Sequence, residues 1–314
     1  MGHFLHAVGV FFHHLTAVQW QFLGLAVACH IIKLFFRAAA WCTIVRAAYP
    51  QDRLKYRTAL GAYLAGVGVN SIVPARGGDI VKMYLVKHRL RDATYATLAP
   101  TLLVETLFDF FTAGALIVWA LASGVLPARQ LYTRIPAVDW KFFLRHPHPT
   151  EIALAILLAL SIVGYIWARR RYDQFRIHVR QGFAILGQRR RLLLGVILPQ
   201  AISWVFRIAS LFFFLKAFGV TANLYNAFLA QVVDSLATLF PATPGGAGTK
   251  QGLTEFLFRG RGVSHTLLLA FSVGMNITLV VVNLLMGLIA ILLMARTLSF
   301  KRLRTSARAE EQPA

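Results

Sequence analysis

The chain has 314 residues, of which 57% are hydrophobic and only 14% are charged, and its formal net charge is +21. This charged fraction is well below the roughly 25% of soluble domains, which excludes an ordinary soluble protein and indicates a polytopic membrane protein. A large positive charge is also typical of nucleic-acid-binding proteins. Here, however, the basic residues gather at the ends of apolar stretches, as in cytoplasmic loops under the positive-inside rule, so no nucleic-acid partner is expected.

In chain order, the apolar stretches predict an all-α fold. Residues 1–16 form a short amphipathic segment, and its four histidines are not expected to bind metal because no Cys, Asp or Glu lies near them. Five later stretches are long enough to cross a hydrocarbon core of about 30 Å. They are predicted as full spans at about 17–46, 96–124, 150–168, 192–218 and 266–294. Two shorter apolar pieces, at about 58–75 and 224–241, each run into a polar interruption. The first interruption is 70–79 and the second is 239–251, and a short helix follows each, at about 78–88 and 247–258.

The basic residues predict the topology. They concentrate in 46–57, 82–91, 169–191 and the tail 296–314. If all four segments are cytoplasmic, the N-terminus lies outside and the C-terminus inside. Residues 58–80 must then enter the membrane and return to the same side, while the second interruption enters from the opposite face. This topology places loop 125–149 outside, although the loop carries four basic residues and one acid.

Segment 169–191 holds eight arginines interleaved with apolar residues. One interpretation is a helix lying on the inner leaflet, attracted to anionic headgroups by about 1 kcal/mol per basic residue near the surface. The other is an ordinary cytoplasmic loop.

The two interruptions combine proline, glycine and charge inside apolar sequence. Backbone that leaves a helix at membrane depth survives only where protein or a water-filled cavity covers it, and matched interruptions in two halves point to a transport site. A helix starting after each glycine run directs free N–H groups at its loop, an arrangement that binds phosphate or carboxylate. Arg76, Lys82 and Lys250 add full charges there. The alternative is that glycine and proline only permit a tight bend.

Charged residues inside the spans are candidates for function, because they are costly at membrane depth. Glu105 and Asp109 share one helix face at i and i+4, and Arg207 is the candidate cation between them. Asp234 precedes the second interruption. These residues either contact a substrate or proton, or form a buried ion-pair cluster that only locks the helices together. Arg37, in the span that also holds Lys33, is interpreted as a residue that snorkels to the cytoplasmic surface.

At these residues the chain resembles the flippase-like transmembrane domain of the lysylphosphatidylglycerol synthase family. The first family pattern is matched by Asn70, Pro74, Arg76, Gly78, Asp79 and Lys82, and the second by Pro241, Pro244, Gly245, Gly246, Gly248, Lys250 and Gly252. Glu105 and Asp109 also look like family positions. Gln251 stands where the family usually has glutamate, and an amide can hold hydrogen bonds but cannot carry a proton. The chain resembles stand-alone members without the aminoacyltransferase domain, so lipid synthesis is not implied.

The resulting expectation is a single integral membrane domain over 1–314, located in the cytoplasmic membrane. It would be a flippase-like lipid translocase for an anionic phospholipid or polyprenyl-phosphate type of headgroup. An ion-coupled transporter of a small solute and a non-transporting accessory of lipid modification are the alternatives, and homo-oligomers are compatible with all three. No enzyme signature, Walker loop, metal site or cofactor is indicated. The candidate substrate-binding residues are Asn70, Pro74, Arg76, Gly78, Asp79, Lys82, Glu105, Asp109, Arg207, Asp234, Pro244, Gly245, Gly246, Gly248, Lys250 and Gln251.

Overall fold

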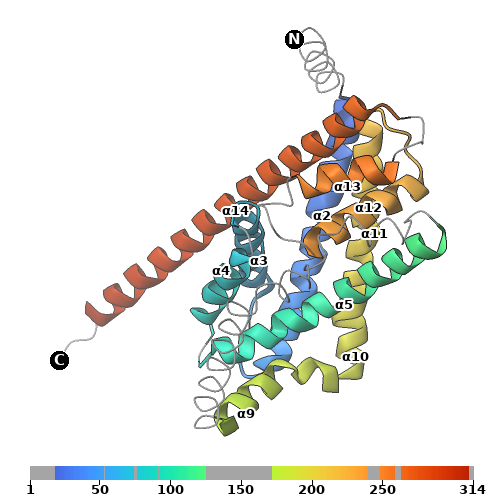
Figure 1. Cartoon of the computed structure of the whole chain (residues 1–314). Helices are drawn as coiled ribbons and strands as arrows, with labels where there is room; N and C mark the ends of the chain where they lie inside the picture. The colour runs from blue at the N-terminus through green and yellow to red at the C-terminus, as the bar shows by residue number, and fades with distance from the viewer. Residues whose placement is uncertain are drawn as a thin grey trace, which may run out of the picture.

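The computed structural model describes residues 18–52, 54–73, 76–90, 92–124, 172–239, 248–258 and 263–310, with the side chains of 172–175, 238–239 and 295–310 left undescribed. All regular structure in these ranges is helical, which confirms the predicted fold class (Figure 1). The predicted segment 1–16, loop 125–149 and span 150–168 lie outside the described residues.

Four of the predicted spans are confirmed among the described residues. Each is a helix long and apolar enough to cross a membrane. They are α2 (Trp20–Ala48), α5 (Tyr95–Ala122), the continuous helical stretch Arg189–Ala217, and the His265–Met294 part of α14 (His265–Glu310). The helices α2 and α11 (Leu198–Ala217) run in opposite directions along each other (Figure 1).

The first interruption forms a hairpin whose two ends lie at the same end of the bundle. Helix α3 (Tyr56–Asn70) enters next to the end of α2, where Arg46 Nε donates to the carbonyl oxygen of Leu54 at 2.8 Å. Helix α4 (Gly77–Lys87) returns to that end, and Arg89 donates to the carbonyl oxygen of Met294 on α14 at 3.2 Å. The predicted entry and return of this segment are therefore present in the structure.

The second hairpin enters from the opposite end. Helix α11 ends at Ala217, whose carbonyl oxygen accepts a hydrogen bond from the N–H of Gln19, just before α2, at 2.9 Å. Helices α12 (Leu224–Leu239) and α13 (Thr249–Phe258) follow from this end, and α14 starts beside them (Figure 1). The two hairpins are thus oppositely oriented, as predicted. Which end faces the cytoplasm stays a prediction.

The described part of the basic segment docks at the end of the bundle where the first hairpin enters. It comprises α9 (Tyr172–Gly182), the 3₁₀ turn η1 (Ala184–Gly187), α10 (Arg189–Leu192) and the π-helical turn η2 (Leu193–Ile197), which continues into α11. Gln181 donates to the carbonyl oxygen of Ala48 at 2.7 Å, which fixes α9 against the end of α2. Pro199 has no N–H to give the carbonyl one turn earlier, and such a gap in the hydrogen-bond ladder is commonly absorbed by a π turn.

Each hairpin is seated in its own apolar cluster. The first cluster surrounds α3 and α4 and includes Trp41, Ala62, Val86, Leu98 and Met294. The second surrounds α12 and α13 and includes Phe214, Leu229, Leu257, Phe258 and Phe271. Because α2, α5 and α14 contribute residues to both clusters, each of these long helices carries a part of both halves.

The first hairpin closes through a backbone contact that only glycine permits. A Cβ atom added to Gly78 would lie 1.9 Å from the carbonyl oxygen of Gly66, far inside van der Waals contact. The Oδ1 atom of Asn70 accepts a hydrogen bond from the Gly78 N–H at 2.7 Å, so the side chain that ends α3 caps the start of α4. Asn70 and Gly78 therefore shape the tip together.

Gly78→Ala is expected to lower the free energy of unfolding by about 1–3 kcal/mol, the usual cost of overpacking a tight contact. Gly252→Ala is the matched control, because nothing lies within 4 Å of a Cβ at that position of α13. Alanine is the better helix former there by roughly 0.5–1 kcal/mol. Thermal unfolding of the detergent-purified variants should therefore shift in opposite directions. Equal shifts would contradict the close approach of α3 and α4.

Candidate functional site

Two acids of α5 hold one arginine of α2 at the centre of the bundle. The Nη atoms of Arg37 contact both carboxylate oxygens of Asp109, at 2.9 and 2.6 Å, and Nη2 reaches Glu105 at 3.1 Å. Its Nε donates to the hydroxyl oxygen of Tyr63 on α3 at 2.6 Å. The Arg37 side chain is only 12% exposed. A single guanidinium fork thus joins α2, α3 and α5.

The first hairpin contributes a lysine to the same acids. Lys82 of α4 places its Nζ 2.5 Å from Glu105 Oε2, and both side chains are almost fully buried. The ammonium also lies over the aromatic rings of Trp41 and Tyr63, at 4.4 and 4.2 Å from their centroids. The Tyr63 hydroxyl donates to the other Glu105 oxygen at 2.8 Å. Since a buried charge needs both a partner and hydrogen bonds, these contacts explain how Lys82 tolerates its position.

The second hairpin repeats this arrangement with one acid. Asp234 of α12 contacts Arg207 of α11 at 2.6 Å and Lys250 of α13 at 2.6 Å, one through each carboxylate oxygen. All three side chains are about one-fifth exposed or less. Asp234 therefore joins three helices of the second half, as Glu105 and Arg37 join helices of the first.

Trp204 connects the two groups. Its indole Nε1 donates to Asp109 at 2.9 Å, and the guanidinium carbon of Arg207 lies 4.9 Å from the centre of its ring. An unbroken series of polar and cation–π contacts therefore runs from one hairpin to the other. We call it the ion-pair chain, and its members in spatial order are Lys82, Glu105, Arg37, Asp109, Trp204, Arg207, Asp234 and Lys250.

The ion-pair chain lies at membrane depth. Arg37, Glu105 and Arg207 each lie well inside a spanning helix, ten or more positions along the chain from either helix end. At 1.5 Å rise per residue this is about 15 Å from the ends, close to the middle of a hydrocarbon core of roughly 30 Å.

Lys33 lies beside this chain without an acid of its own. It is one helical turn before Arg37 on α2 and within electrostatic range of Asp109, Arg207 and Asp234. Within the described ranges it makes no ion pair at contact distance. It is a cation held near two others, Arg37 and Arg207.

Two predictions about these charges are wrong. Arg207 was the expected partner of Glu105 and Asp109, but it pairs with Asp234, because α11 presents it to α12. Arg37 was interpreted as snorkelling to the surface, but it is the cation between the two acids. Helix α2 continues eleven residues beyond Arg37, to Ala48. The side chain therefore lies too deep to reach an interface.

The tips of the hairpins differ from the predicted anion site. Arg76 is 63% exposed and pairs with Asp79 at 3.0 Å, one turn away, so neither residue joins the ion-pair chain. The Gly78 N–H is already taken by Asn70, and the Gly248 N–H donates to Gln251 Oε1 at 2.6 Å. Amide side chains therefore occupy N–H groups that were expected to be free. Of the predicted tip residues, Pro74, Pro244, Gly245 and Gly246 lie outside the described residues.

Sequence reasoning passed over three aromatic members of the site, Trp41, Tyr63 and Trp204. Trp204 carried a usable signal, because it precedes Arg207 by three residues and so shares its helix face. Trp41 follows Arg37 by four residues, but the cation over its ring is Lys82 of α4. An aromatic ring beside a membrane-embedded cation on one face is thus a pattern that could have indicated the contact of Trp204 with Arg207.

The fold and the ion-pair chain together define a class: an all-α membrane protein with two opposed hairpins whose basic residues meet on buried acids at mid-membrane. The sequence profile of one family, described as the lysylphosphatidylglycerol synthase TM region, matches residues 5–287. The chain belongs to this family. Comparisons with curated proteins and with solved structures found no match.

Proposed function

We propose that this protein is a flippase-like lipid translocase, without catalytic activity of its own, that binds a phosphate-bearing anionic headgroup at the ion-pair chain. Membership of a family named for a lipid-modifying synthase supports a lipid-related role. The observation that carries the proposal is the charge balance at the centre of the bundle.

The described charges at mid-membrane do not cancel. Five basic side chains meet three carboxylates, which leaves a formal excess of two positive charges; the Arg76–Asp79 pair at the tip is neutral by itself. Uncompensated charge in a low-dielectric region is strongly unfavourable. An anion that enters next to Lys33 lowers this excess, and a phosphate group also supplies acceptor oxygens for lysine and arginine.

The geometry also suggests how binding would be coupled to movement. Each hairpin contributes one lysine to the ion-pair chain, Lys82 from the first and Lys250 from the second. A phosphate next to Lys33 would compete with Asp234 for Arg207, and with Asp109 for Arg37. Such competition would loosen the contacts of one hairpin while the other stays paired, which is the kind of alternation that opposed hairpins support. Under the predicted topology, with the N-terminus outside and the C-terminus cytoplasmic, the first hairpin opens to the cytoplasm.

The test is translocation of tail-labelled lipids in liposomes that contain the purified protein, followed by quenching of the label in the outer leaflet. Wild-type protein should move phosphatidylglycerol and a polyprenyl phosphate faster than phosphatidylcholine. Protein-dependent rates equal to those of empty liposomes would refute the proposal. Anion-independent movement would favour a general lipid pathway, and solute-coupled uptake without lipid movement would favour a secondary transporter.

Lys33→Gln is expected to slow translocation of the anionic lipids by roughly tenfold or more, because one charge-assisted contact is worth about 1.5–3 kcal/mol. Its thermal unfolding should stay close to wild type, since no ion pair is broken. Lys216→Gln is the matched control, because Lys216 lies in the last turn of α11 and contacts the ring of Phe22 instead. A Lys33→Gln variant that translocates lipid slowly but unfolds like wild type would indicate that Lys33 contacts the substrate. A purely structural role would lower the stability as well.

A further inference from the structure

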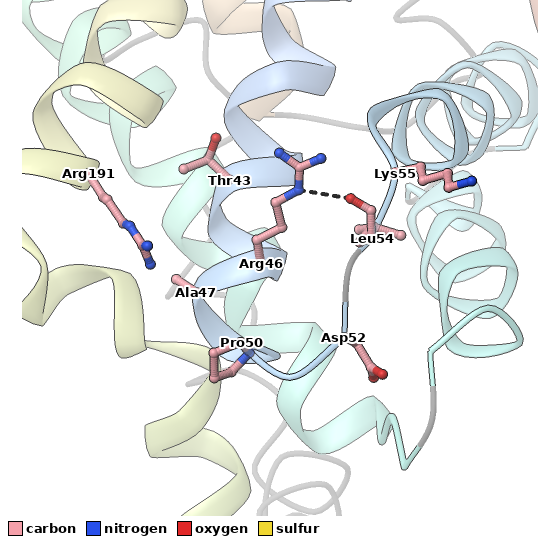
Figure 2. A pocket seen from close by; sticks show the side chains of 8 residues that line it. All are labelled: Thr43, Arg46, Ala47, Pro50, Asp52, Leu54, Lys55 and Arg191. Atoms are coloured by element: carbon pink, nitrogen blue, oxygen red, sulfur yellow. Dashed lines mark hydrogen bonds between the residues drawn. The ribbon is translucent and has the colours of Figure 1, made fainter.

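A second site lies at the end of the bundle where the first hairpin enters. A pocket of about 640 Å³ opens there between α2, the α2–α3 loop and α10. Figure 2 shows the end of α2 in the middle, with Arg191 on one side and the loop residues Leu54 and Lys55 on the other. Because Arg46 follows Arg37 by nine residues on α2, this pocket is roughly 14 Å further along the helix axis than the ion-pair chain.

The described residues that line this pocket carry an excess of positive charge, as do those around the ion-pair chain. Arg46, Lys55 and Arg191 line it, and Asp52 is the one acid among its described lining residues. Among the described residues, Arg46 donates through its Nε, toward Leu54, and Arg191 donates through one Nη, toward Gln188 at 2.9 Å. A guanidinium has five N–H donors, so most of the donors around the pocket remain available to a ligand.

The surface next to the pocket is apolar and exposed. Leu193, Leu194, Ile197 and Leu198 follow Arg191 directly along η2 and the start of α11, and all four are exposed. Gly195 brings η2 against α2, because a Cβ there would lie 2.6 Å from Thr43, which also lines the pocket. The basic pocket is therefore followed directly along the chain by an exposed helix surface that is suited to acyl chains.

We propose that this pocket binds the phosphate headgroup of an anionic phospholipid at the membrane surface, as a lipid site separate from the ion-pair chain. Three cations from three segments of the chain line the pocket that would receive the phosphate, and the acyl chains would lie along η2. A soluble anion would use the same cations, but it would gain nothing from the exposed leucines. Basic pockets beside membrane-spanning helices are suited to anionic lipids for this reason.

The experiment counts lipids retained by the detergent-purified full chain in native mass spectrometry, with phosphatidylglycerol titrated against phosphatidylcholine. The pocket variant carries Arg46→Gln, Lys55→Gln and Arg191→Gln. The control variant carries Arg57→Gln, Arg189→Gln and Arg190→Gln, which removes the same charge from exposed residues that do not line the pocket. The pocket variant should lose one retained phosphatidylglycerol, with an affinity reduced about a hundredfold, while the control keeps it.

Three results would overturn the proposal: equal losses in both variants, which would mean diffuse attraction to a basic surface; unchanged binding in the pocket variant; or displacement of the lipid by inorganic phosphate at a similar concentration.

If the triple variant does not fold, Arg191→Gln alone serves, because Arg191 is exposed and bonds only Gln188 within the described residues. That variant should weaken binding about tenfold, and wild-type affinity in it would equally reject the site. Lys33 does not line this pocket, so the Lys33→Gln test of the proposed function and the lipid-retention test of the pocket can fail independently of each other.

Discussion

Arg37→Gln is expected to destabilise the protein by about 3–5 kcal/mol, the usual cost of removing one partner from a buried ion pair. The arginine contacts Asp109 through two nitrogens, Glu105 through one and Tyr63 through its Nε. Glutamine cannot supply this charge, so Asp109 keeps only the indole N–H of Trp204 among its described hydrogen bonds. The thermal unfolding midpoint of the detergent-purified variant measures the loss.

Arg57→Gln is the matched control, because Arg57 is an exposed residue near the start of α3, where a surface charge contributes about 0–1 kcal/mol. Arg37→Lys should fall between wild type and Arg37→Gln, since lysine keeps the charge but not the planar fork. Adding Asp109→Asn to Arg37→Gln should recover part of the loss by removing the orphaned carboxylate. An Arg37→Gln variant as stable as Arg57→Gln would show that these contacts do not hold the bundle together.

Asp234→Asn is expected to release the second hairpin. The substitution leaves Arg207 and Lys250 as neighbouring cations without their carboxylate, again at a cost of about 3–5 kcal/mol. Because Lys250 is the contact of α13 with the ion-pair chain, backbone amides of Thr249–Phe258 should exchange hydrogen faster than in wild type. Amides of α3 should change much less, since the first hairpin is fixed by its own contacts to Glu105. Hydrogen exchange resolved by peptide measures both.

Asp92→Asn provides the control for Asp234→Asn. Asp92 is exposed and adopts a positive φ of 56°, a conformation that asparagine accepts as readily as aspartate, so little change is expected. Lys250→Met in the Asp234→Asn background removes one of the two unpaired cations and should restore part of the stability. Equal exchange rates of α13 in wild type and Asp234→Asn would contradict the role of this pair.

The sequence predicted most of the fold because its signals are local. The length of each apolar stretch indicates a span, and proline with glycine inside such a stretch indicates a break in the helix. The distribution of arginine and lysine was enough to orient two hairpins oppositely, and the structure has that arrangement. The residue types of the site followed as well, since a charge at membrane depth stands out in apolar sequence.

The pairing of those charges could not be read from the sequence. Glu105 and Asp109 were correctly placed on one face, because i and i+4 spacing is a property of a single helix. Their partner depends on which helix crosses α5 at that level, and this is Arg37 of α2 rather than Arg207. The tip residues show the same limit. Arg76, whose backbone has a φ of 60°, pairs with Asp79 at the tip and does not join the ion-pair chain.

For this protein, the sequence by itself determined the class, the spans, the hairpins and the set of charges that must be accommodated inside the membrane. The tertiary structure decided which charges neutralise one another, and thereby that Lys33 lies beside the ion-pair chain with no acid at contact distance in the part of the chain that the structure describes. The physical reason is that hydrophobicity and helix periodicity act over neighbouring residues. Ion pairing acts over a few ångströms between helices that are distant in the chain, as with Arg37 and Asp109, which are 72 residues apart.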